Sequence, residues 1–228
     1  KFDEKENIVN IINVNNEYLK CTKKIAFFNP IWSDTGDLFV AEDSSGWWNI
    51  TQIKTDSNHK SITIIQNKWT IQAEIAFPQW LLGMSSFSCH GENVIGAFSQ
   101  DGIWTLALFR KSGSIQIIDQ PFIEFSGLHS DKNRLVAIAS SSVISEGIFE
   151  LDVLNKNWDH TPASSFSLNP CQISIGESFW FKGSNEESVH AWYYPPLDRQ
   201  ITLPPLLVKS HSGPTGMARC GLDLEVQF

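Results

Sequence analysis

Short apolar runs separated by polar turns fill most of this chain, and few segments repeat apolar residues at helical spacing. Such runs, bounded by turn residues, predict β-strands. One order of segments recurs: a polar turn, an apolar strand, a second turn and a strand with aromatic residues. The apolar strands of these units begin at Leu38, Val94 and Leu135, and a weaker fourth unit has its strand at Phe179. The pattern therefore predicts a mainly β fold.

The spacing of these units indicates the architecture. Leu38, Val94, Leu135 and Phe179 lie about 56, 41 and 44 residues apart, and four-stranded propeller blades repeat every 40 to 50 residues or so. We therefore predict a partial β-propeller of about three to four blades. An insertion after the first blade, Asn67 to Trp80, is expected to hold a short helix. A β-sandwich would also give regularly spaced strands, but the repeated internal order favours the propeller.

Charge and apolar content exclude several partners. The net charge of −8 argues against binding to nucleic acid or to an anionic membrane surface. No apolar run approaches the roughly 20 residues that a membrane span needs, and the first ten residues have no apolar segment typical of a signal peptide. We expect no nucleic-acid or membrane partner and a cytoplasmic location.

The cysteines and histidines show no spacing typical of a metal site or a disulfide framework. The four cysteines are widely scattered and form no C-x-x-C pair, and the six histidines form no H-x-x-x-H or H-E-x-x-H pattern. We therefore predict free thiols, no metal and no cofactor.

The stretch LPPLLVKSHSGPTG, residues 203–216, has a different character. Leu206 to Lys209 form a mostly apolar run that predicts a buried strand. The run ends in a His-Ser-Gly-Pro turn that begins at His211. A strand followed by a His-Gly turn and the start of a helix is how α/β-hydrolases build half of an oxyanion hole. We therefore expect the first strands of an α/β-hydrolase domain to follow the propeller.

Six motifs in a specific order extend this interpretation. They are NPxWSDxGDLFV from Asn29, SGWWN from Ser45, FPQWLLG from Phe77, FSQDGIWTLAL from Phe98, HAWYYPP from His190 and HSGPTG from His211. Together they resemble the middle of a prolyl oligopeptidase family member, in particular of its dipeptidyl-aminopeptidase and acylaminoacyl-peptidase branch. The resemblance implies propeller blades over residues 1–168 and the truncated start of a hydrolase domain over residues 169–228.

The resemblance also implies a function. Members of that family are serine peptidases that cleave short peptides with a Ser-Asp-His triad. This chain contains no G-x-S-x-G nucleophile elbow, so we expect the triad to lie beyond Phe228 and the chain alone to be inactive. The alternative is a non-catalytic propeller module that binds a protein or peptide.

Four residues are candidates for the site. By resemblance, the turn of His211, Ser212 and Gly213 belongs to the oxyanion region, where donors stabilise developing negative charge. Ser212 replaces the family's usual glycine, and a positive φ there would be strained. It is not expected to be a nucleophile, because the other triad members are missing. Glu74 corresponds to the propeller carboxylates that hold a substrate amine in related aminopeptidases; the alternative is a solvated helix carboxylate.

Two structural expectations complete the prediction. The stretch Ser45 to Asn49, with its paired tryptophans, is interpreted as a turn between two blade strands rather than as a ligand platform. An arc of three or four blades leaves blade faces without neighbours, and nine tryptophans and fifteen phenylalanines predict that these faces are apolar. We therefore expect self-association through open blade faces.

Overall fold

The computed structural model describes residues 25–56, 62–78, 80–131, 133–165, 167–198, 203–213 and 215–227. Helical structure in this part of the chain is short: the 3-10 turns η1 (Pro170–Gln172) and η2 (Ser184–Glu186) and the helix α2 (Leu224–Gln227). Within the described residues, no helix has the length and apolar character needed to cross a membrane.

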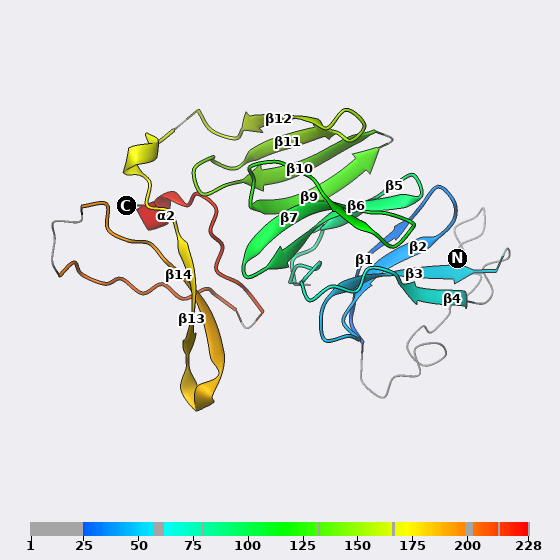
Figure 1. Ribbon diagram of the computed structural model, residues 1–228, viewed down its shortest axis with the longest axis horizontal. Coiled ribbons are helices and arrows are strands. Elements are labelled where there is room, and N and C mark those ends of the chain that lie inside the picture. Colours follow the sequence, from blue (N-terminus) through cyan, green and yellow to red (C-terminus); the bar gives the residue numbers. More distant parts are fainter. Residues whose placement is uncertain are drawn as a thin grey trace.

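Three antiparallel four-stranded sheets make up most of the molecule (Figure 1). Each sheet runs in chain order from one edge to the other, like a propeller blade. The first contains β1 (Phe27–Trp32), β2 (Leu38–Glu42), β3 (Asn49–Thr55) and β4 (Ile62–Asn67), the second β5 (Phe87–His90), β6 (Asn93–Gln100), β7 (Ile103–Phe109) and β8 (Ile115–Ile117), and the third β9 (Glu124–Asp131), β10 (Arg134–Ser140), β11 (Gly147–Asp152) and β12 (Asn157–Pro162).

The sequence prediction of three like units is confirmed. Leu38, Val94 and Leu135 all lie at the start of the second strand of their sheet. The first strands face one another across the blades, because β5 packs against both β1 and β9. A sandwich would instead divide these strands between two facing sheets. The fold is therefore a mainly β, partial β-propeller.

One apolar core runs through all three blades, and its largest side chains are aromatic. Trp69 lies between Phe39 of the first blade and Phe109 of the second, with ring centroids 6.1 and 5.8 Å away. Phe77 stacks on Trp104 at 4.6 Å. Because aromatic side chains bury large areas and prefer defined ring geometries, these contacts fix how each blade packs on the next.

The connection from β4 to β5 crosses the seam between the first two blades as an extended chain. Glu74 forms an isolated antiparallel bridge with Ser99, and the Ile75 amide donates to the Trp48 carbonyl at 3.0 Å. The Asn49 amide donates to the Ile71 carbonyl, and its oxygen accepts from the Ile71 N–H. The helix expected within Asn67–Trp80 is therefore wrong for the described residues: these backbone groups bond to neighbouring blades instead of to one another.

The turn from β2 to β3 has the structural role that the sequence predicts. It falls between Glu42 and Asn49, and Gly46 takes a φ of 87°, which suits glycine. Trp48 is half-buried and packs edge-on against Phe28 at 6.5 Å.

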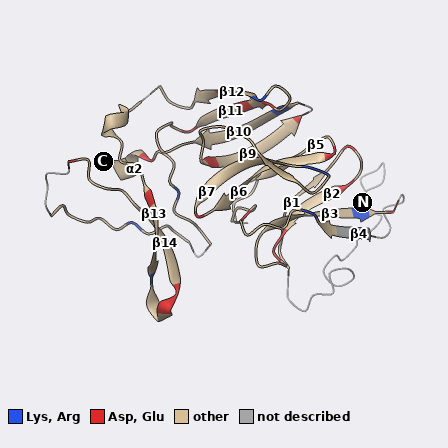
Figure 2. Cartoon of the chain, viewed as in Figure 1, with Lys and Arg blue, Asp and Glu red and all other residues tan. Residues whose placement is uncertain are grey.

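The fourth repeat unit does not form a blade in the described chain. It gives a two-stranded hairpin of β13 (Glu177–Lys182) and β14 (Ser188–Tyr193). Phe179 lies in the first of these strands, not in the second as the repeat predicts. Figure 2 shows acidic residues at the tip of this hairpin. The blade number over the described residues is therefore three rather than four.

The apolar run Leu206–Lys209 forms no strand, so this expectation is also wrong. Leu206, Leu207 and Val208 are 78 to 90% exposed. A parallel strand is stable only with hydrogen-bonded neighbours and covering layers, and no strand of the described chain pairs with this run. The assignment of residues 169–228 to a hydrolase domain stays a prediction.

Candidate functional site

The His211 turn is exposed and compact. Nδ1 of His211 lies 3.3 Å from the carbonyl oxygen of Ser212 and donates to it in the Nδ1–H tautomer. Gly213 takes the left-handed conformation, with φ 75°, and Ser212 does not. Gly216 closes the turn, because a Cβ there would lie 2.5 Å from the Ser212 carbonyl oxygen. The strain that a serine would suffer at a positive φ is therefore absent from Ser212.

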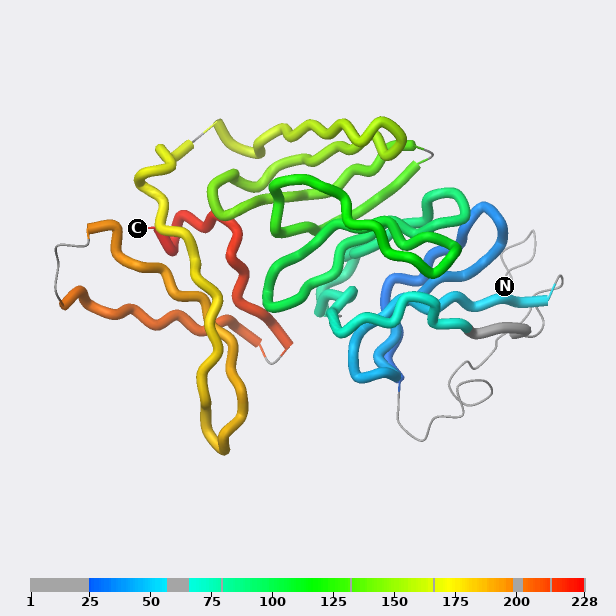
Figure 3. The backbone as a smooth tube through the Cα atoms, viewed as in Figure 1, coloured from blue at the N-terminus to red at the C-terminus, as the bar shows by residue number. Residues whose placement is uncertain are grey.

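The residues after this turn, Thr215 to Leu222, lie against the propeller, and we call them the docked segment (Figure 3). The indole N–H of Trp80 donates to Oγ1 of Thr215 at 2.8 Å. The indole N–H of Trp192 donates to the Ala218 carbonyl at 3.3 Å. The Leu222 amide donates to the carbonyl of Ser141, at the end of the third blade's second strand, at 2.8 Å. The turn is thus followed directly by a segment held at several points.

Glu124, the first residue of β9, lies at the centre of this contact. Its side chain is buried, and Oε1 accepts the backbone N–H of Cys220 at 3.1 Å. Its Oε2 lies 3.6 Å from Nη1 of Arg219. The Arg219 guanidinium in turn lies 5.7 Å from the centre of the Phe77 ring, within the range of a cation–π contact. One propeller carboxylate therefore binds two consecutive residues of the docked segment.

Burial dominates the ionisation of this cluster. It raises the pKa of Glu124 above its usual range, against the opposing effect of Arg219 and of the Cys220 and Gly221 amides. Burial also raises the pKa of Tyr194. Burial, with a smaller contribution from Glu124, raises the pKa of the Cys220 thiol to about 12. Because the thiolate is the nucleophilic form, Cys220 is a packing residue rather than a reactive one.

The structure places Glu74, the predicted substrate-binding carboxylate, at the seam of the first two blades. Its Oε2 accepts the backbone N–H of Trp48 at 3.0 Å, and its own backbone pairs with Ser99. It is half-buried and belongs to no helix, so the alternative of a solvated helix carboxylate is wrong. Its role toward a substrate stays a prediction.

A cavity of about 680 Å³ lies at the opposite end of the blades from the docked segment. Glu124 begins β9 and Asp131 ends it, and eight extended residues span roughly 25 Å. The cavity is formed where the first and second strands of the three blades turn. Its lining residues are Ile31, Trp32, Asp34, Ser88, Cys89, His90, Gly91, Glu92, Asn93, Ser130, Asp131 and Asn133.

The chemistry of this cavity is acidic and not nucleophilic. Asp34, Glu92 and Asp131 supply three carboxyl groups. Burial lowers the pKa of His90, which favours its neutral form, and its Nδ1 lies 3.3 Å from Oγ of Ser130. Burial, with smaller contributions from nearby aspartates, raises the pKa of Cys89 to about 11. The arrangement suits binding of a polar or cationic group rather than covalent chemistry.

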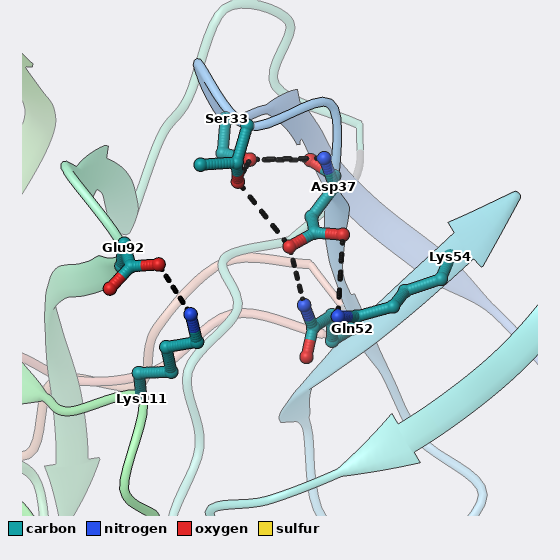
Figure 4. A network of polar contacts seen from close by, with 7 residues as sticks. Ser33, Asp37, Gln52, Lys54, Glu92 and Lys111 are labelled. Carbon is teal, nitrogen blue, oxygen red and sulfur yellow. Dashed lines mark hydrogen bonds and ion pairs between the residues drawn. The ribbon is translucent and has the colours of Figure 1, made fainter. Parts of the chain in front are cut away.

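A polar network beside the cavity holds the turn of the first blade (Figure 4). Oδ2 of Asp37 accepts from Nε2 of Gln52 at 2.8 Å, and Oδ1 lies 3.8 Å from Nζ of Lys54. In the second blade, Lys111 donates to Glu92. These contacts fix the positions of two turns that border the cavity.

Glu124 and Arg219 were missed by reasoning from the sequence. They come from segments far apart in the chain, since Glu124 and Cys220 are 96 positions apart. The available signal was a single acidic residue inside the apolar stretch PFIEF, residues 121–125. An isolated charge in such a run indicates either an exposed edge or a buried partner.

Comparisons with known proteins show which solved structures share this fold. No protein-family model and no curated protein matches the chain. A crystal structure of puromycin hydrolase matches 89% of the chain with 25% identity and a TM-score of 0.78. A puromycin-hydrolyzing peptidase from Mycobacterium tuberculosis matches 90% with 22% identity and a TM-score of 0.77. Prolyl oligopeptidase B from Galerina marginata matches 73% with 10% identity and a TM-score of 0.56, which shows the fold alone.

The chain therefore shares its propeller fold with puromycin hydrolase and with prolyl oligopeptidase B. Of these three structures, the puromycin hydrolase has the highest sequence identity to the chain, 25% over the matched residues. The chain spans about a third of the length of these two puromycin-cleaving proteins, 31 and 32%.

Proposed function

We propose that this chain is the propeller and the first part of the hydrolase domain of a serine peptidase that removes N-terminal residues from short peptides and peptide-like amides. The observation that carries the proposal is the docked segment, which joins a His-Ser-Gly turn to the propeller face. The similarity to puromycin hydrolase, which extends over 89% of the chain, supports the proposal.

In this proposal, the His211 turn supplies part of the oxyanion site. Donors held toward the developing negative charge of a tetrahedral intermediate are worth several kcal/mol in the transition state, about 10²–10³-fold in rate for one donor. The exposed position of His211 and the left-handed Gly213 leave the turn accessible to a substrate. The nucleophile, its base and the orienting carboxylate come from a hydrolase domain that carries a G-x-S-x-G elbow.

The proposed substrate class follows from the propeller and from the structural relatives. Propeller blades beside the active site restrict entry to short chains. Puromycin is an aminoacyl amide with a free α-amine, so a hydrolase acting on it releases one amino acid. For this chain we propose the dipeptidyl or acylaminoacyl branch of the family, a substrate amine bound by Glu74, and a cytoplasmic location.

The direct test measures hydrolysis by the protein that contains this chain together with the elbow. Short unblocked peptides, aminoacyl p-nitroanilides and puromycin are compared with their N-acetylated forms and with a folded protein substrate. We expect His211→Ala to lower kcat about 10²-fold, and His129→Ala, at an exposed site in the third blade, to leave it unchanged. No hydrolysis of any short amide would overturn the proposal.

The 228-residue chain alone should be catalytically silent. It contains no G-x-S-x-G elbow, and Ser212 has no base within its turn other than His211, whose ring contacts the backbone. A fluorophosphonate probe should leave every serine of the chain unlabelled, as read by mass spectrometry of the intact protein. Stoichiometric labelling of Ser212 would require a different mechanism.

A second candidate function, a non-catalytic module that binds a protein or peptide, is favoured by the acidic cavity at the opposite end of the blades. Titration with a lysine-rich and a glutamate-rich peptide of equal length separates the two. Tight binding of the basic peptide by the chain alone, without turnover in the elbow-containing protein, would favour this alternative.

A further inference from the structure

Glu124 is a buried carboxylate whose partners belong to another part of the chain. Within the described residues, its hydrogen bond and its ion pair both go to the docked segment, through Cys220 and Arg219. No hydrogen bond from the part of the chain that the structure describes reaches its buried Oε2. By contrast, the buried Glu42 is satisfied inside its own blade, by the Thr51 hydroxyl at 3.0 Å and the Ser44 N–H at 2.7 Å.

A buried, incompletely paired carboxylate such as Glu124 contributes little to the stability of the fold. Burying a charge costs more than incomplete pairing returns, so an uncharged residue of similar shape often stabilises a protein as well or better. Arg219 lies 3.6 Å away and is about two-fifths exposed, so its attraction is partly screened. Charges kept in costly positions are concentrated at functional sites.

The backbone of the docked segment approaches this carboxylate very closely. A Cβ on Gly221 would lie 2.7 Å from Oγ of Ser140 and 3.1 Å from Cγ of Glu124. The Leu222 amide bonds to Ser141 directly after it. The third blade therefore leaves no room for a side chain at Gly221, and the backbone of the segment packs directly against it. Cys220 follows His211 by only nine residues, so this placement is transmitted to the His211 turn over a short distance.

We infer that Glu124 is a positioning residue: by fixing the docked segment on the third blade, it sets the location of the His211 turn relative to the propeller. The inference rests on the proposed function for its catalytic consequence, but not for the docking itself. The propeller then helps to hold the oxyanion region in place, beyond limiting which substrates enter. A displacement of about 1 Å in such a group can cost about 10²-fold in rate.

The inference predicts opposite effects of pH on stability and on catalysis. The groups that face Glu124 are Arg219, the Cys220 thiol and Tyr194. Because the pKa of Glu124 is raised in the folded state, its contribution to stability is fully present below its ordinary pKa and is lost as pH rises through the raised value. The ion pair with Arg219 needs the carboxylate, so positioning improves over the same rise in pH.

The docking is tested on the 228-residue chain by hydrogen exchange at the Cys220 and Leu222 amides. Glu124→Ala should speed exchange of the Cys220 amide about tenfold or more, whereas Glu124→Gln keeps an oxygen acceptor and most of the protection. Arg219→Met, at a partly exposed site, is a second variant that leaves no buried cavity and should also speed exchange. Glu42→Gln is the matched control and should leave both amides unchanged. Unchanged exchange in Glu124→Ala and Arg219→Met would overturn the inference.

The catalytic consequence is tested in the elbow-containing protein. Glu124→Ala, which undocks the segment, should lower kcat about tenfold with little change in KM, because the turn acts on the transition state. Glu124→Gln, which keeps the docking but cannot ionise, should keep most of kcat and flatten the acidic limb of the kcat profile. Glu42→Gln should do neither. Normal kcat in Glu124→Ala, with its Cys220 amide exchanging fast, would overturn the positioning role. If the wild type hydrolyses nothing, the proposed function fails while the exchange result still decides the docking.

Discussion

The three blades and the region after them use the same kinds of residue with opposite results. In the blades, Trp104, Phe109 and Phe125 are at most 1% exposed. In the β13–β14 hairpin, Phe179, Trp180 and Phe181 are 43 to 57% exposed. Both sets lie on antiparallel strands rich in aromatic residues. Neighbouring sheets make the difference, since each blade packs on the next, whereas the hairpin contacts a blade turn at Gly102 and the docked segment at Ala218.

The comparison teaches that composition predicts what a strand can bury, and topology decides what it does bury. The docked segment combines features of the blades and of the region after them. It contains no strand, yet Cys220 is buried like the blade core, because Glu124 accepts the Cys220 N–H and the Ser141 carbonyl accepts the Leu222 N–H. The next four predictions test how far the two regions differ, from the largest expected effect to the smallest.

Self-association should be the largest effect. The open face of the third blade carries Ile138 and Ile148, which pair across β10 and β11 and are 42 and 53% exposed. At roughly 25 cal/mol per Å², covering about 400 Å² of such surface with the hairpin aromatics or a second blade is worth on the order of 10 kcal/mol before association costs. We propose a dimer at micromolar concentration, measured by light scattering, and its dissociation in Ile148→Glu. A monomer at every concentration would contradict it.

Truncating an aromatic residue should cost several kcal/mol more unfolding free energy in the blades than in the hairpin. Trp104→Ala removes a ring stacked on Phe77 in the blade core and should cost about 3–5 kcal/mol of unfolding free energy. Trp180→Ala, at a side chain 57% exposed, should stay within about 0.5 kcal/mol in the monomer. Urea denaturation monitored by far-UV circular dichroism measures both. Equal costs would mean that the hairpin is buried in solution.

The thiol of Cys220, in the docked segment, should react as slowly as a cysteine buried in the blades. With a pKa raised to about 12, Cys220 has about a thousandth of the thiolate of an ordinary cysteine at pH 8. Cys89, at about 11, has about a hundredth. Iodoacetamide at pH 8 should therefore modify the exposed Cys171 before Cys89 and Cys220, as measured by peptide mass spectrometry. Rapid modification of Cys220 would mean that the segment undocks.

A single methyl group should probe the contact between the regions. Gly102 has φ 81°, and a Cβ there would lie 2.7 Å from the Trp192 ring. Gly46 has a similar φ of 87° with nothing within 4 Å. Gly46→Ala should cost about 1 kcal/mol for backbone strain alone, and Gly102→Ala about 1–3 kcal/mol in total. Thermal unfolding compares them; equal losses would show that β14 does not pack on the second blade.

The sequence predicted the blades well because their information is local. Turn residues, alternating apolar strands and regular spacing placed Leu38, Val94 and Leu135 in equivalent positions. The helix predicted within the insertion Asn67–Trp80 is wrong because groups of this segment bond across the seam, to Trp48 and Ser99. A local sequence pattern does not reveal such distant partners. The strand predicted at Leu206–Lys209 is wrong for a related reason, because a parallel strand depends on neighbouring strands that are distant in sequence.

The candidate site was predicted only in part, for the same physical reason. The His211 turn has a local signature, and its conformation is locally determined by Gly213 and Gly216. Glu124 has none, because its significance comes from Arg219 and Cys220, which fold onto it from the other end of the chain. A buried charge becomes visible only when the partner segment is placed.

The extended connection between β4 and β5 has a consequence for the order in which the molecule opens. It bonds to the first blade through Trp48 and Asn49, to the second through Ser99 and to the third through Ser85 and Leu128. A strand of one sheet can detach without breaking bonds to a neighbouring blade, but detaching this connection breaks its hydrogen bonds to all three blades. The blades should therefore unfold as one cooperative unit, rather than peel away singly as repeats in an open array do.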